Sequence, residues 1–339
     1  MINGIINVYK EKGFTSHDVV AKLRGILRQK KIGHTGTLDP EAEGVLPVCL
    51  GKATRVCDML TEKDKVYEAQ LLLGTATDTQ DTTGTVQSRR PVTCSQEEAE
   101  KAILSFVGEY DQLPPMYSAL KVNGKKLCDL ARAGIEVERK PRTVTIFSIR
   151  ILELSLPRVR MEVHCSKGTY IRTLCHDIGE ALGCGGCMES LLRTRAAGFV
   201  LEDARKLGEI EELVHSVRAG GRIQPEERAG SQVQPEEKAG GRIQPENTVS
   251  SQRELTEEDL PELVKHTDYV FRQYPEVSVK PEFRKLLLNG NPLKPQWITA
   301  WKPEYQETVF RVYDECGVFT GIYQWEESRK DIRPVKILR

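Results

Sequence analysis

The sequence predicts an α+β fold with a mixed, mainly antiparallel sheet, followed by a small β-barrel-like module. Three observations support this prediction. Strand-like runs follow one another directly, as at residues 143–155 and 158–165, and helical patterns stand between groups of strands rather than after every strand. A repeat-rich stretch interrupts the chain after residue 215. The residues beyond 276 then contain short strand-like runs joined by turns.

The first part of the chain contains several strand and helix patterns. Residues 5–8 predict a strand, and Ser16 is a residue type that caps a helix by accepting a hydrogen bond from its first turn. Residues 40–55 are expected to supply a helix and a strand beside the preceding loop. Residues 66–73 and Val86 predict strands. The helix after Ser16 follows from apolar residues at helical spacing, which are Val19, Val20, Leu23, Ile26 and Leu27.

Later elements follow from the same patterns. Residues 96–106 predict a helix, and Pro157 marks the turn of a hairpin between residues 143–155 and 158–165. Residues 169–182 predict a helix that ends at Gly183, because glycine readily adopts the left-handed conformation found after helices. Further elements complete the pattern: helices at 257–269 and 283–288, and strands at 308–313, 318–325 and 335–338.

The chain divides into four parts. We expect a folded body over residues 1–215, a flexible low-complexity insertion over 216–255, a connecting helix packed on the body over 256–275, and the β-rich module over 276–339. The insertion contains three near-copies of one unit, AGGRIQPEER, AGSQVQPEEK and AGGRIQPENT. Such a unit buries too little apolar surface to offset the entropy of ordering.

Charge and composition restrict the class of protein. Residues 202–262 carry 15 acidic and 8 basic residues, which leaves 41 basic and 34 acidic residues in the rest of the chain. A basic body suits a nucleic-acid binder, and an ordinary solvated surface explains it about as well. No apolar run is long enough to span a membrane, and no signal peptide is apparent. Nine cysteines, an odd number, favour reduced thiols and a cytoplasmic location.

One loop carries the strongest functional signal. Residues 33–55 read GHTGTLDPEAEGVLPVCLGKATR, and the small and turn-forming residues at the start lead directly to Asp39. Pro40 disfavours the helical conformation for Asp39, so a single carboxylate is expected on a stiff loop. Such loops often carry chemistry. The later part of this stretch resembles a phosphate-binding loop only superficially, because the glycine spacing is wrong and Ala53 follows Lys52 where a hydroxyl residue is required.

Other candidates have plain structural explanations. Cys184 and Cys187 form a single CxxC pair, whereas a structural zinc site needs about four ligands, so we expect no metal. Tyr67 is readily explained as a half-buried strand residue. Arg172 is less easily explained, since a cation near the start of a helix opposes the helix dipole and therefore indicates a specific anionic partner.

The basic residues group around two segments. One cluster leads into the Gly33 loop, and a second lies in a polar loop between PPMYSAL and the next strand. Clustered cations suit a phosphate backbone, although solvated basic surfaces are slightly more common. The cationic residues are Lys22, Arg24, Arg28, Lys30 and Lys31 in the first cluster, and Lys121, Lys125, Lys126, Arg139, Lys140 and Arg142 in the second.

Together, four segments resemble the TruB-type tRNA pseudouridine-55 synthases. They are GHTGTLDPEAEGVLP, DKVYEA, PPMYSALK with GKKLCDLARAG, and SKGTYIRTLCHDIGEALGCG, in the order found in that family. The resemblance covers residues 1 to about 215, which would form the catalytic domain with an RNA-gripping insertion at about 114–142. Residues 276–339 resemble the PUA-like RNA-binding domain that follows in the family. Cys128, where the family usually has tyrosine, and the repeats are departures from its pattern.

The resemblance also implies roles for individual residues. Asp39 corresponds to the catalytic aspartate and Arg172 to the arginine that pairs with it. Tyr67 corresponds to the tyrosine that stacks on the target base, and Leu191 to a leucine that lines the uracil pocket. His34 corresponds to the histidine that fills the gap left by the flipped nucleotide.

The activity implied is isomerisation of uridine 55 to pseudouridine in the T arm of tRNA. An isomerisation needs no redox partner or hydrolytic water, so no cofactor is expected. We expect a monomer with no obligate protein partner. Two alternatives stay open: a non-catalytic RNA-binding or tRNA-folding factor with the same fold, and a guide-RNA-dependent pseudouridine synthase. The intact set of Asp39, Tyr67 and Arg172 argues against the first, and the basic loop from Lys121 to Arg142 against the second.

Overall fold

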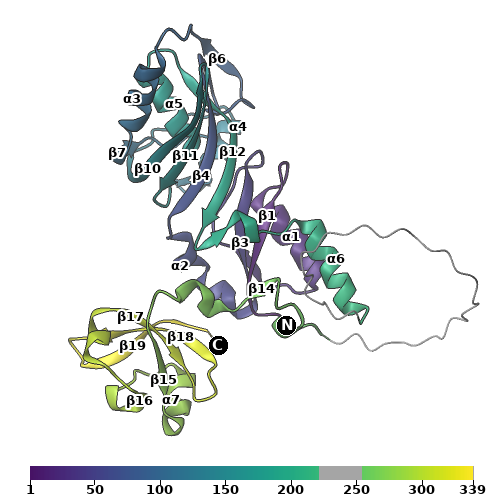
Figure 1. The fold of residues 1–339 in the computed structure, drawn as a ribbon, viewed down its shortest axis with the longest axis vertical. Helices are drawn as coiled ribbons and strands as arrows, with labels where there is room; N and C mark the ends of the chain where they lie inside the picture. Colours follow the sequence, from purple (N-terminus) through teal and green to yellow (C-terminus); the bar gives the residue numbers. More distant parts are fainter. Residues whose placement is uncertain (221–253, 339) are drawn as a thin grey trace, which may run out of the picture.

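The computed structural model describes residues 1–220 and 254–338, and its main feature is one mixed sheet of ten strands (Figure 1). The main path runs β14-β1-β3-β12-β4-β11-β10-β7, with β2 paired to β3 and β13 paired to β12. Neighbouring strands are antiparallel, except that β12 runs parallel to β3. This confirms the predicted α+β class with a mainly antiparallel sheet.

One half of the sheet is built around the N-terminal strand. An apolar cluster that includes Leu23, Leu46 and Ile210 joins the strands to helices α1 and α6. The elements of this half are β1 (Gly4–Lys10), α1 (Ser16–Leu27), β2 (Ile32–His34), β3 (Glu43–Leu50), α2 (Cys57–Thr61), β13 (Phe199–Val200), α6 (Leu207–Arg218) and β14 (Val264–Lys265).

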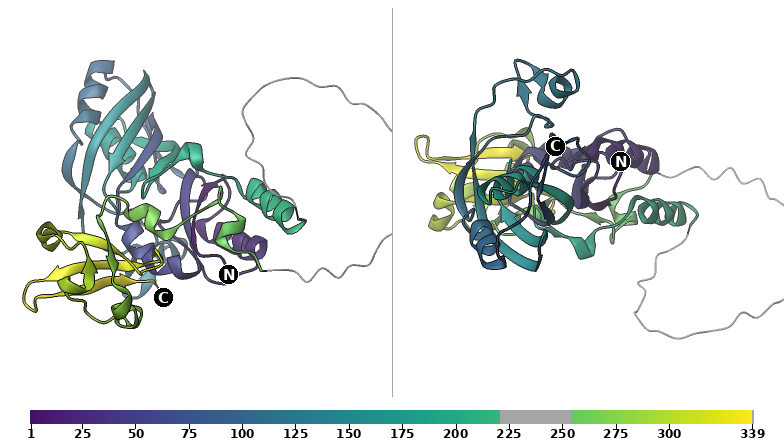
Figure 2. Two further views of the ribbon diagram at one scale, coloured as in Figure 1. Left: turned by 60° about the horizontal axis from the view of Figure 1, so that its bottom comes forward. Right: turned by 90° about the horizontal axis from the view of Figure 1, so that it is seen from above.

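The other half carries the longer strands, and helices α3 and α5 cover one of its faces (Figures 1 and 2). The predicted hairpin is present as β10 and β11, whose residues pair in antiparallel register. The elements are β4 (Lys65–Leu73), β5 (Thr75–Thr77), β6 (Val86–Arg89), α3 (Gln96–Leu104), β7 (Gly108–Gln112), β10 (Arg142–Ser155), β11 (Arg158–Cys165), α5 (Ile171–Ala181) and β12 (Gly186–Ala196).

Residues 114–142 form a separate projection. It contains the two-stranded pair β8 (Lys121–Val122) and β9 (Lys125–Lys126), followed by α4 (Leu127–Arg132). The projection stands out from the body when the molecule is seen from above (Figure 2). Its two ends are tied together, because Arg139 Nη1 donates a hydrogen bond to the carbonyl oxygen of Pro114 at 2.9 Å.

The C-terminal module is a five-stranded sheet in the order β16-β15-β17-β18-β19. A bridge between Leu293 and Ile332 links the segment before β16 to β19. Among the described residues, however, β16 and β19 are not paired, so the sheet is open rather than a closed barrel. Its elements are β15 (Glu276–Val279), α7 (Arg284–Asn289), β16 (Ile298–Thr299), β17 (Val309–Tyr313), β18 (Phe319–Glu326) and β19 (Asp331–Ile337).

Three expectations are corrected. The cap of α1 is Thr15, which forms a capping box with Asp18, and not Ser16. The predicted connecting helix at 257–269 is absent: the chain there forms short 3₁₀ turns and the strand β14, because Pro261 interrupts helical hydrogen bonding. Helix α6 continues to Arg218, beyond the expected end of the body at residue 215. Most of the predicted insertion at 216–255 lies outside the described residues.

Candidate active site

The Asp39 loop joins β2 to β3 and is anchored at several points. Thr35 donates hydrogen bonds from its N–H and its hydroxyl to the carbonyl oxygen of Pro47, each at 3.1 Å. The N–H of Leu38 donates to Ser16 Oγ at 2.9 Å, so the first residue of α1 holds the residue before Asp39. These hydrogen bonds tie the loop to β3 and to α1.

A buried lysine holds the other side of the loop. Lys10 is fully buried, and its Nζ donates to the carbonyl oxygens of Pro40 at 3.1 Å and Ala42 at 2.5 Å. Burial lowers the pKa of Lys10 to about 8, because a charged amine loses hydration there. Lys10 therefore fixes Pro40 and Ala42, which lie between Asp39 and the start of β3.

Arg172, from the first turn of α5, meets two carboxylates. Its Nε lies 2.9 Å from Asp39 Oδ2, and its Nη1 lies 3.6 Å from Asp81 Oδ2. The guanidinium also donates hydrogen bonds to the carbonyl oxygens of Thr79 at 3.0 Å and Tyr117 at 2.8 Å. Each nitrogen of this buried guanidinium thus has a partner, which compensates a charge that is costly to bury alone. The contact with Asp39 is the ion pair that the resemblance implies.

Burial and the neighbouring charges act in opposite directions on Asp39. Its side chain is 40% exposed at the rim of a cavity. Desolvation raises the pKa of Asp39 above its usual value, and the negative charge of Asp81 raises it further. The positive charges of Arg172 and Lys10 lower the pKa and favour the ionised form. The net effect is a raised pKa.

The cavity beside Asp39 has a volume of about 620 Å³. Besides Asp39 and Arg172, it is lined by Tyr67 and Leu191, each 8% exposed. The cavity falls in the usual size range of small-molecule pockets, about 300–1,000 Å³. The structure therefore brings four of the five predicted site residues, Asp39, Tyr67, Arg172 and Leu191, to one cavity.

His34, the fifth residue, lies outside the lining of this cavity. It ends β2, and its ring contacts the ring of His17 edge to face, with centroids 5.3 Å apart. The N–H of Gly36 donates to His34 Nδ1 at 3.4 Å. Burial and the charges of His17 and Arg193 lower the pKa of His34. A neutral imidazole therefore stands next to the loop that carries Asp39.

Arg193 is a site residue that sequence reasoning missed. It comes from β12, lines the cavity and is only 1% exposed. Its Nε donates to the carbonyl oxygen of Val45 at 2.7 Å, and its Nη2 approaches that of Gly36 at 3.5 Å. Among residues 1–220 and 254–338, no carboxylate forms an ion pair with it. A buried guanidinium without a counter-ion thus stands at the wall of the cavity.

Arg193 also acts on Tyr67. Burial raises the pKa of the Tyr67 hydroxyl, and hydrogen bonding and the charge of Arg193 partly oppose that rise. The phenol is consequently neutral near pH 7.

Asp81 and Lys10 were missed as well. Asp81 lies in a polar turn without any motif, and Lys10 reads as an ordinary surface lysine; only their buried contacts reveal them.

In the part of the chain that the structure describes, no cluster of three or more histidine, cysteine, aspartate or glutamate side chains is arranged to hold a metal ion. Within the same residues, no helix combines the length and apolar character that a membrane crossing requires.

The sequence comparisons identify the class of enzyme. The chain matches the family model described as TruB family pseudouridylate synthase, N-terminal domain, over residues 24–171. It matches the tRNA pseudouridylate synthase B C-terminal domain over residues 172–239. These two models place the chain among the pseudouridine synthases, which are isomerases. Both matches end before residues 276–339, so the PUA-like assignment of that module still rests on its resemblance.

Curated relatives define the family more closely. The chain is 50% identical to tRNA pseudouridine synthase B of Lachnoclostridium phytofermentans over 346 aligned residues, covering 99% of each protein. It is 40% identical to the protein of the same name from Alkaliphilus oremlandii, again over 99% of each. The chain therefore belongs to the TruB family of pseudouridylate synthases.

Solved structures support the fold. A Cbf5-Nop10-Gar1 complex matches with a TM-score of 0.70 at 24% identity, covering 99% of this chain and 85% of that one. An H/ACA RNP bound to a substrate RNA containing 2′-deoxyuridine matches with a TM-score of 0.67 at 22% identity, with the same coverage. At these identities the likeness concerns the fold alone.

Proposed function

We propose that this chain converts uridine 55 in the T arm of tRNA to pseudouridine, with Asp39 as the catalytic carboxylate. One observation carries the proposal: the Asp39 carboxylate stands at the rim of a cavity of about 620 Å³, fixed by an ion pair with Arg172. Membership of the TruB family and relatives named tRNA pseudouridine synthase B supply the reaction and the RNA.

The reaction needs one nucleophile and a closed site. The bond between C1′ and N1 of the uridine breaks, the uracil turns, and C1′ joins C5; the C5 proton is lost and a proton is gained at N1. Asp39 is suited either to attack the nucleotide or to accept a proton from the ribose, and both roles require its ionised form. The Arg172 guanidinium, held 2.9 Å from the carboxylate, favours that form and fixes its direction.

The walls of the cavity suit a detached uracil. Tyr67 offers a ring face for stacking, and Leu191 an apolar contact. Both keep the free base within the site until the new bond forms. The buried charge of Arg193 favours negative charge on the base as the glycosidic bond breaks. The neutral Tyr67 hydroxyl is suited to relay the C5 proton.

The target base must leave the RNA stack before Asp39 can reach it, which costs a few kcal/mol. His34 lies next to the loop that carries Asp39 and is assigned the role of filling the gap left in the RNA. Its lowered pKa supports this role, because a neutral ring stacks in place of a base without bringing an extra charge.

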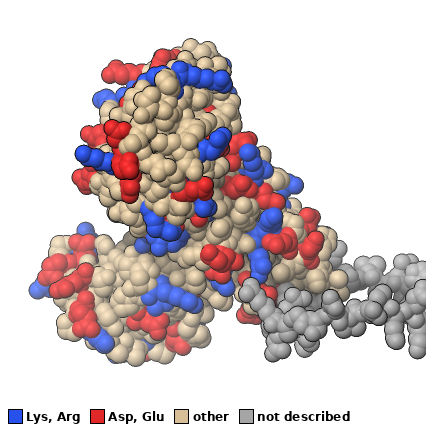
Figure 3. Space-filling model, turned by 45° about the horizontal axis from the view of Figure 1, so that its top comes forward, with Lys and Arg blue, Asp and Glu red and all other residues tan. Residues whose placement is uncertain are grey.

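RNA binding is assigned to the 114–142 projection and to the C-terminal module. The projection presents the cations Lys121, Lys125 and Lys126 on exposed positions. On the face drawn in Figure 3, basic and acidic side chains of the described residues are interspersed. We therefore expect local groups of cations, rather than one field over the whole body, to hold the phosphate backbone.

The same proposal includes a cytoplasmic location and a monomeric state, since the substrate is cytoplasmic tRNA and one chain supplies all the residues of the site. Sedimentation of the full-length protein with and without tRNA tests the oligomeric state. A dimer whose dissociation abolishes turnover would contradict the monomer.

Release of hydrogen from C5-tritiated tRNA transcripts tests the activity. Wild-type protein is expected to release one hydrogen per tRNA, and a transcript with cytidine at position 55 to release none. Asp39→Asn should reduce release to background while keeping tRNA affinity, because the amide has nearly the shape of the carboxylate but cannot act as nucleophile or base. Full turnover by Asp39→Asn would contradict the assignment of Asp39.

The same assay separates the alternatives. A non-catalytic binding factor would bind tRNA without any release by the wild-type protein. A guide-dependent enzyme would act only when a guide RNA is added. Turnover on a bare transcript excludes both.

A further inference from the structure

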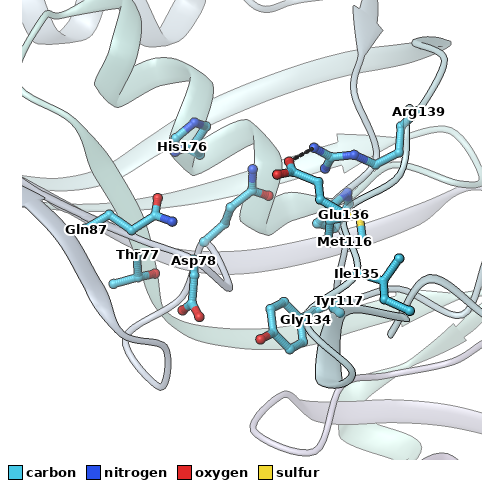
Figure 4. A pocket seen from close by; sticks show the side chains of 13 residues that line it. Thr77, Asp78, Gln87, Met116, Tyr117, Gly134, Ile135, Glu136, Arg139 and His176 are labelled. Carbon is cyan, nitrogen blue, oxygen red and sulfur yellow. Dashed lines mark ion pairs between the residues drawn. The ribbon is translucent and has the colours of Figure 1, made fainter. Parts of the chain in front are cut away.

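A second cavity, of about 320 Å³, lies apart from the Asp39 site (Figure 4). Its walls come from the β5–β6 region, from α5 and from the 114–142 projection. In Figure 4, Gln87, Asp78 and His176 lie on one side, and Met116, Tyr117 and Ile135 lie on the other. Polar groups thus face a wall that combines apolar and aromatic side chains with the ion pair between Glu136 and Arg139.

This cavity is connected to the catalytic ion pair through the backbone. Tyr117 lines the cavity, and Thr79 lies between the lining residues Asp78 and Gln80. The carbonyl oxygens of Thr79 and Tyr117 are the two that accept hydrogen bonds from Arg172. A ligand that orders both walls would therefore also fix the guanidinium that pairs with Asp39.

The polar wall holds hydrogen-bonding capacity that the protein does not use. The Nδ1 atom of His176 is buried and has no partner among the described residues. Gln80 adopts a positive φ of 63°, which is strained for a residue other than glycine, and its Oε1 accepts a hydrogen bond from Thr173 at 2.7 Å. Its amide nitrogen is left to donate. Asp78 uses one carboxylate oxygen to accept from Thr85 N–H at 2.7 Å, which leaves the other to accept.

The charges of the cavity exclude an anionic ligand. Arg139 is its only basic lining residue besides His176, and it is already engaged by the Pro114 carbonyl at 2.9 Å and by Glu136 at 3.7 Å. The carboxylates of Asp78 and Glu136 would repel phosphate. A neutral, flat group with both donors and acceptors fits the walls, and the volume is at the small end of the range for ligand pockets, about 300–1,000 Å³.

We propose that this cavity binds an unstacked base of the substrate RNA, distinct from the uracil that enters the Asp39 cavity. The base lies against Tyr117 and Met116 and hydrogen-bonds to the wall of Gln80, Gln87 and His176. This inference rests on the proposed function, since it takes RNA as the substrate. It predicts that binding of this second base also strengthens the placement of Arg172, and so affects the rate as well as the affinity.

The test uses full-length Asp39→Asn protein, which should bind RNA without turning it over, and a set of T-arm stem-loops, each with one loop nucleotide made abasic. One abasic position is expected to weaken binding by about tenfold, the loss typical of one stacked base. In a Gln87→Trp background, where the indole fills the cavity from exposed β6, that penalty should disappear. Val86→Trp, the adjacent exposed position, is the matched control and should keep it.

Several outcomes are decisive. The same abasic penalties in the Gln87→Trp and Val86→Trp backgrounds would overturn the proposal. Binding of free nucleosides without RNA tests whether the ligand is instead a free nucleoside. If nucleosides bind saturably, Gln87→Trp abolishes that binding, and no abasic penalty depends on Gln87, the cavity binds a free nucleoside and the RNA-base assignment is overturned. For the rate, His176→Ala with intact RNA should lower the single-turnover rate at saturation, and an unchanged rate would contradict the coupling to Arg172.

Failure of the proposed function is distinguishable from failure of this inference. Hydrogen release by wild-type protein on the intact stem-loop reports the proposed function alone. If that release is absent while one abasic position still shows a Gln87-dependent penalty, the cavity binds an RNA base in a protein whose activity is of another kind.

Discussion

At the scale of single residues, the site is organised around one shared cation. Arg172 contacts both Asp39 and Asp81, so the two carboxylates compete for its charge. Asp81 is held in turn by Thr79, whose hydroxyl donates to Asp81 Oδ1 at 2.7 Å. The direction in which Asp39 points therefore depends on a carboxylate that never touches it.

The pH dependence of an Asp81→Asn variant tests this arrangement. Removing the negative charge lowers the raised pKa of Asp39. Since the ionised form of Asp39 is the reactive one, activity rises with pH through this pKa, and the acid limb of kcat/KM should move to lower pH. The maximal kcat should fall because Arg172 loses a contact. Glu153→Gln, on the exposed sheet surface, is the reference; an acid limb that stays in place would contradict the role of Asp81.

Arg193 gives a second test at this scale. Arg193→Met removes the Arg193 donor from the buried carbonyl oxygen of Val45, at a cost of about 1–3 kcal/mol, and from the partly buried one of Gly36. We expect a lower melting temperature together with a fall in kcat of about tenfold or more, because the neighbouring cavity loses its uncompensated charge. Arg195→Met, two residues along the strand and exposed, should change neither. A lower melting temperature with normal kcat would limit Arg193 to a structural role.

The sequence indicated some site residues better than others. Asp39 stands in an unusual run of small and turn-forming residues, so its loop was recognisable without any structure. Arg172 was noticed because a cation opposes the dipole at a helix start. Asp81 and Arg193 gave no local signal, since their partners Arg172 and Val45 lie about 91 and 148 residues away in the chain. Contacts over such separations are set by tertiary packing.

At the scale of elements, α1 and β1 clamp the loop between β2 and β3, which carries Asp39. Ser16 of α1 holds Leu38 on one side, and Lys10 of β1 holds Pro40 and Ala42 on the other. Two elements from the N-terminal segment thus determine where the carboxylate stands, although neither contributes a side chain to the chemistry.

The matched variants Lys10→Met and Lys12→Met test this clamp. Lys10→Met keeps the bulk of the buried side chain but removes the donor of the Ala42 carbonyl oxygen, whereas the Pro40 carbonyl oxygen still accepts from the N–H of Gly13. We expect a stability loss of about 1–3 kcal/mol and a lower kcat. Lys12 pairs with Glu41 on the surface, where ion pairs contribute little; its variant should resemble wild type. Denaturant titration and single-turnover rates measure both, and equal behaviour of the two variants would contradict the clamp.

Regular periodicity made some elements easy to predict. Strand β11 and helix α5 follow their apolar patterns closely, and β10 was predicted as their neighbour although its pairing with β11 contains two register shifts. Strand β12 was missed, because register shifts after Met188 and Arg193 break its alternation of buried and exposed residues. Residues 257–269 look helical by composition, yet Leu260, Leu263 and Val264 instead join the core around α1 and α6. Burial here outweighs helix propensity.

At the scale of the whole molecule, the C-terminal module and the catalytic part share a core. Phe319 and Ile322 of β18 pack in one cluster with Val56 and Phe199 of the catalytic part. Polar contacts at the same border include an ion pair between Lys336 of β19 and Asp58 of α2. The two parts are therefore joined by apolar packing and not only by the chain.

Truncation after residue 275 tests this shared core. Removing residues 276–339 would expose the apolar surface around Val56 and Phe199, so the catalytic part should melt at a lower temperature and tend to aggregate. Lys336→Ala, which removes only a polar contact at the border, should leave the melting temperature nearly unchanged. A truncated protein as stable as the full chain would show that the shared cluster is dispensable. Calorimetry and light scattering provide the measurements.

The pairing of β14 with β1 has a consequence for how the molecule is made on the ribosome. Strand β1 emerges among the first residues of the nascent chain, but Ile5 and Ile6 pair with Lys265 and Val264, which emerge only after the repeats have been synthesised. Until then one margin of the sheet presents unpaired peptide groups, the kind of edge on which other chains can add. The repeat segment therefore lengthens the interval during which this edge of the half-made chain stays unpaired.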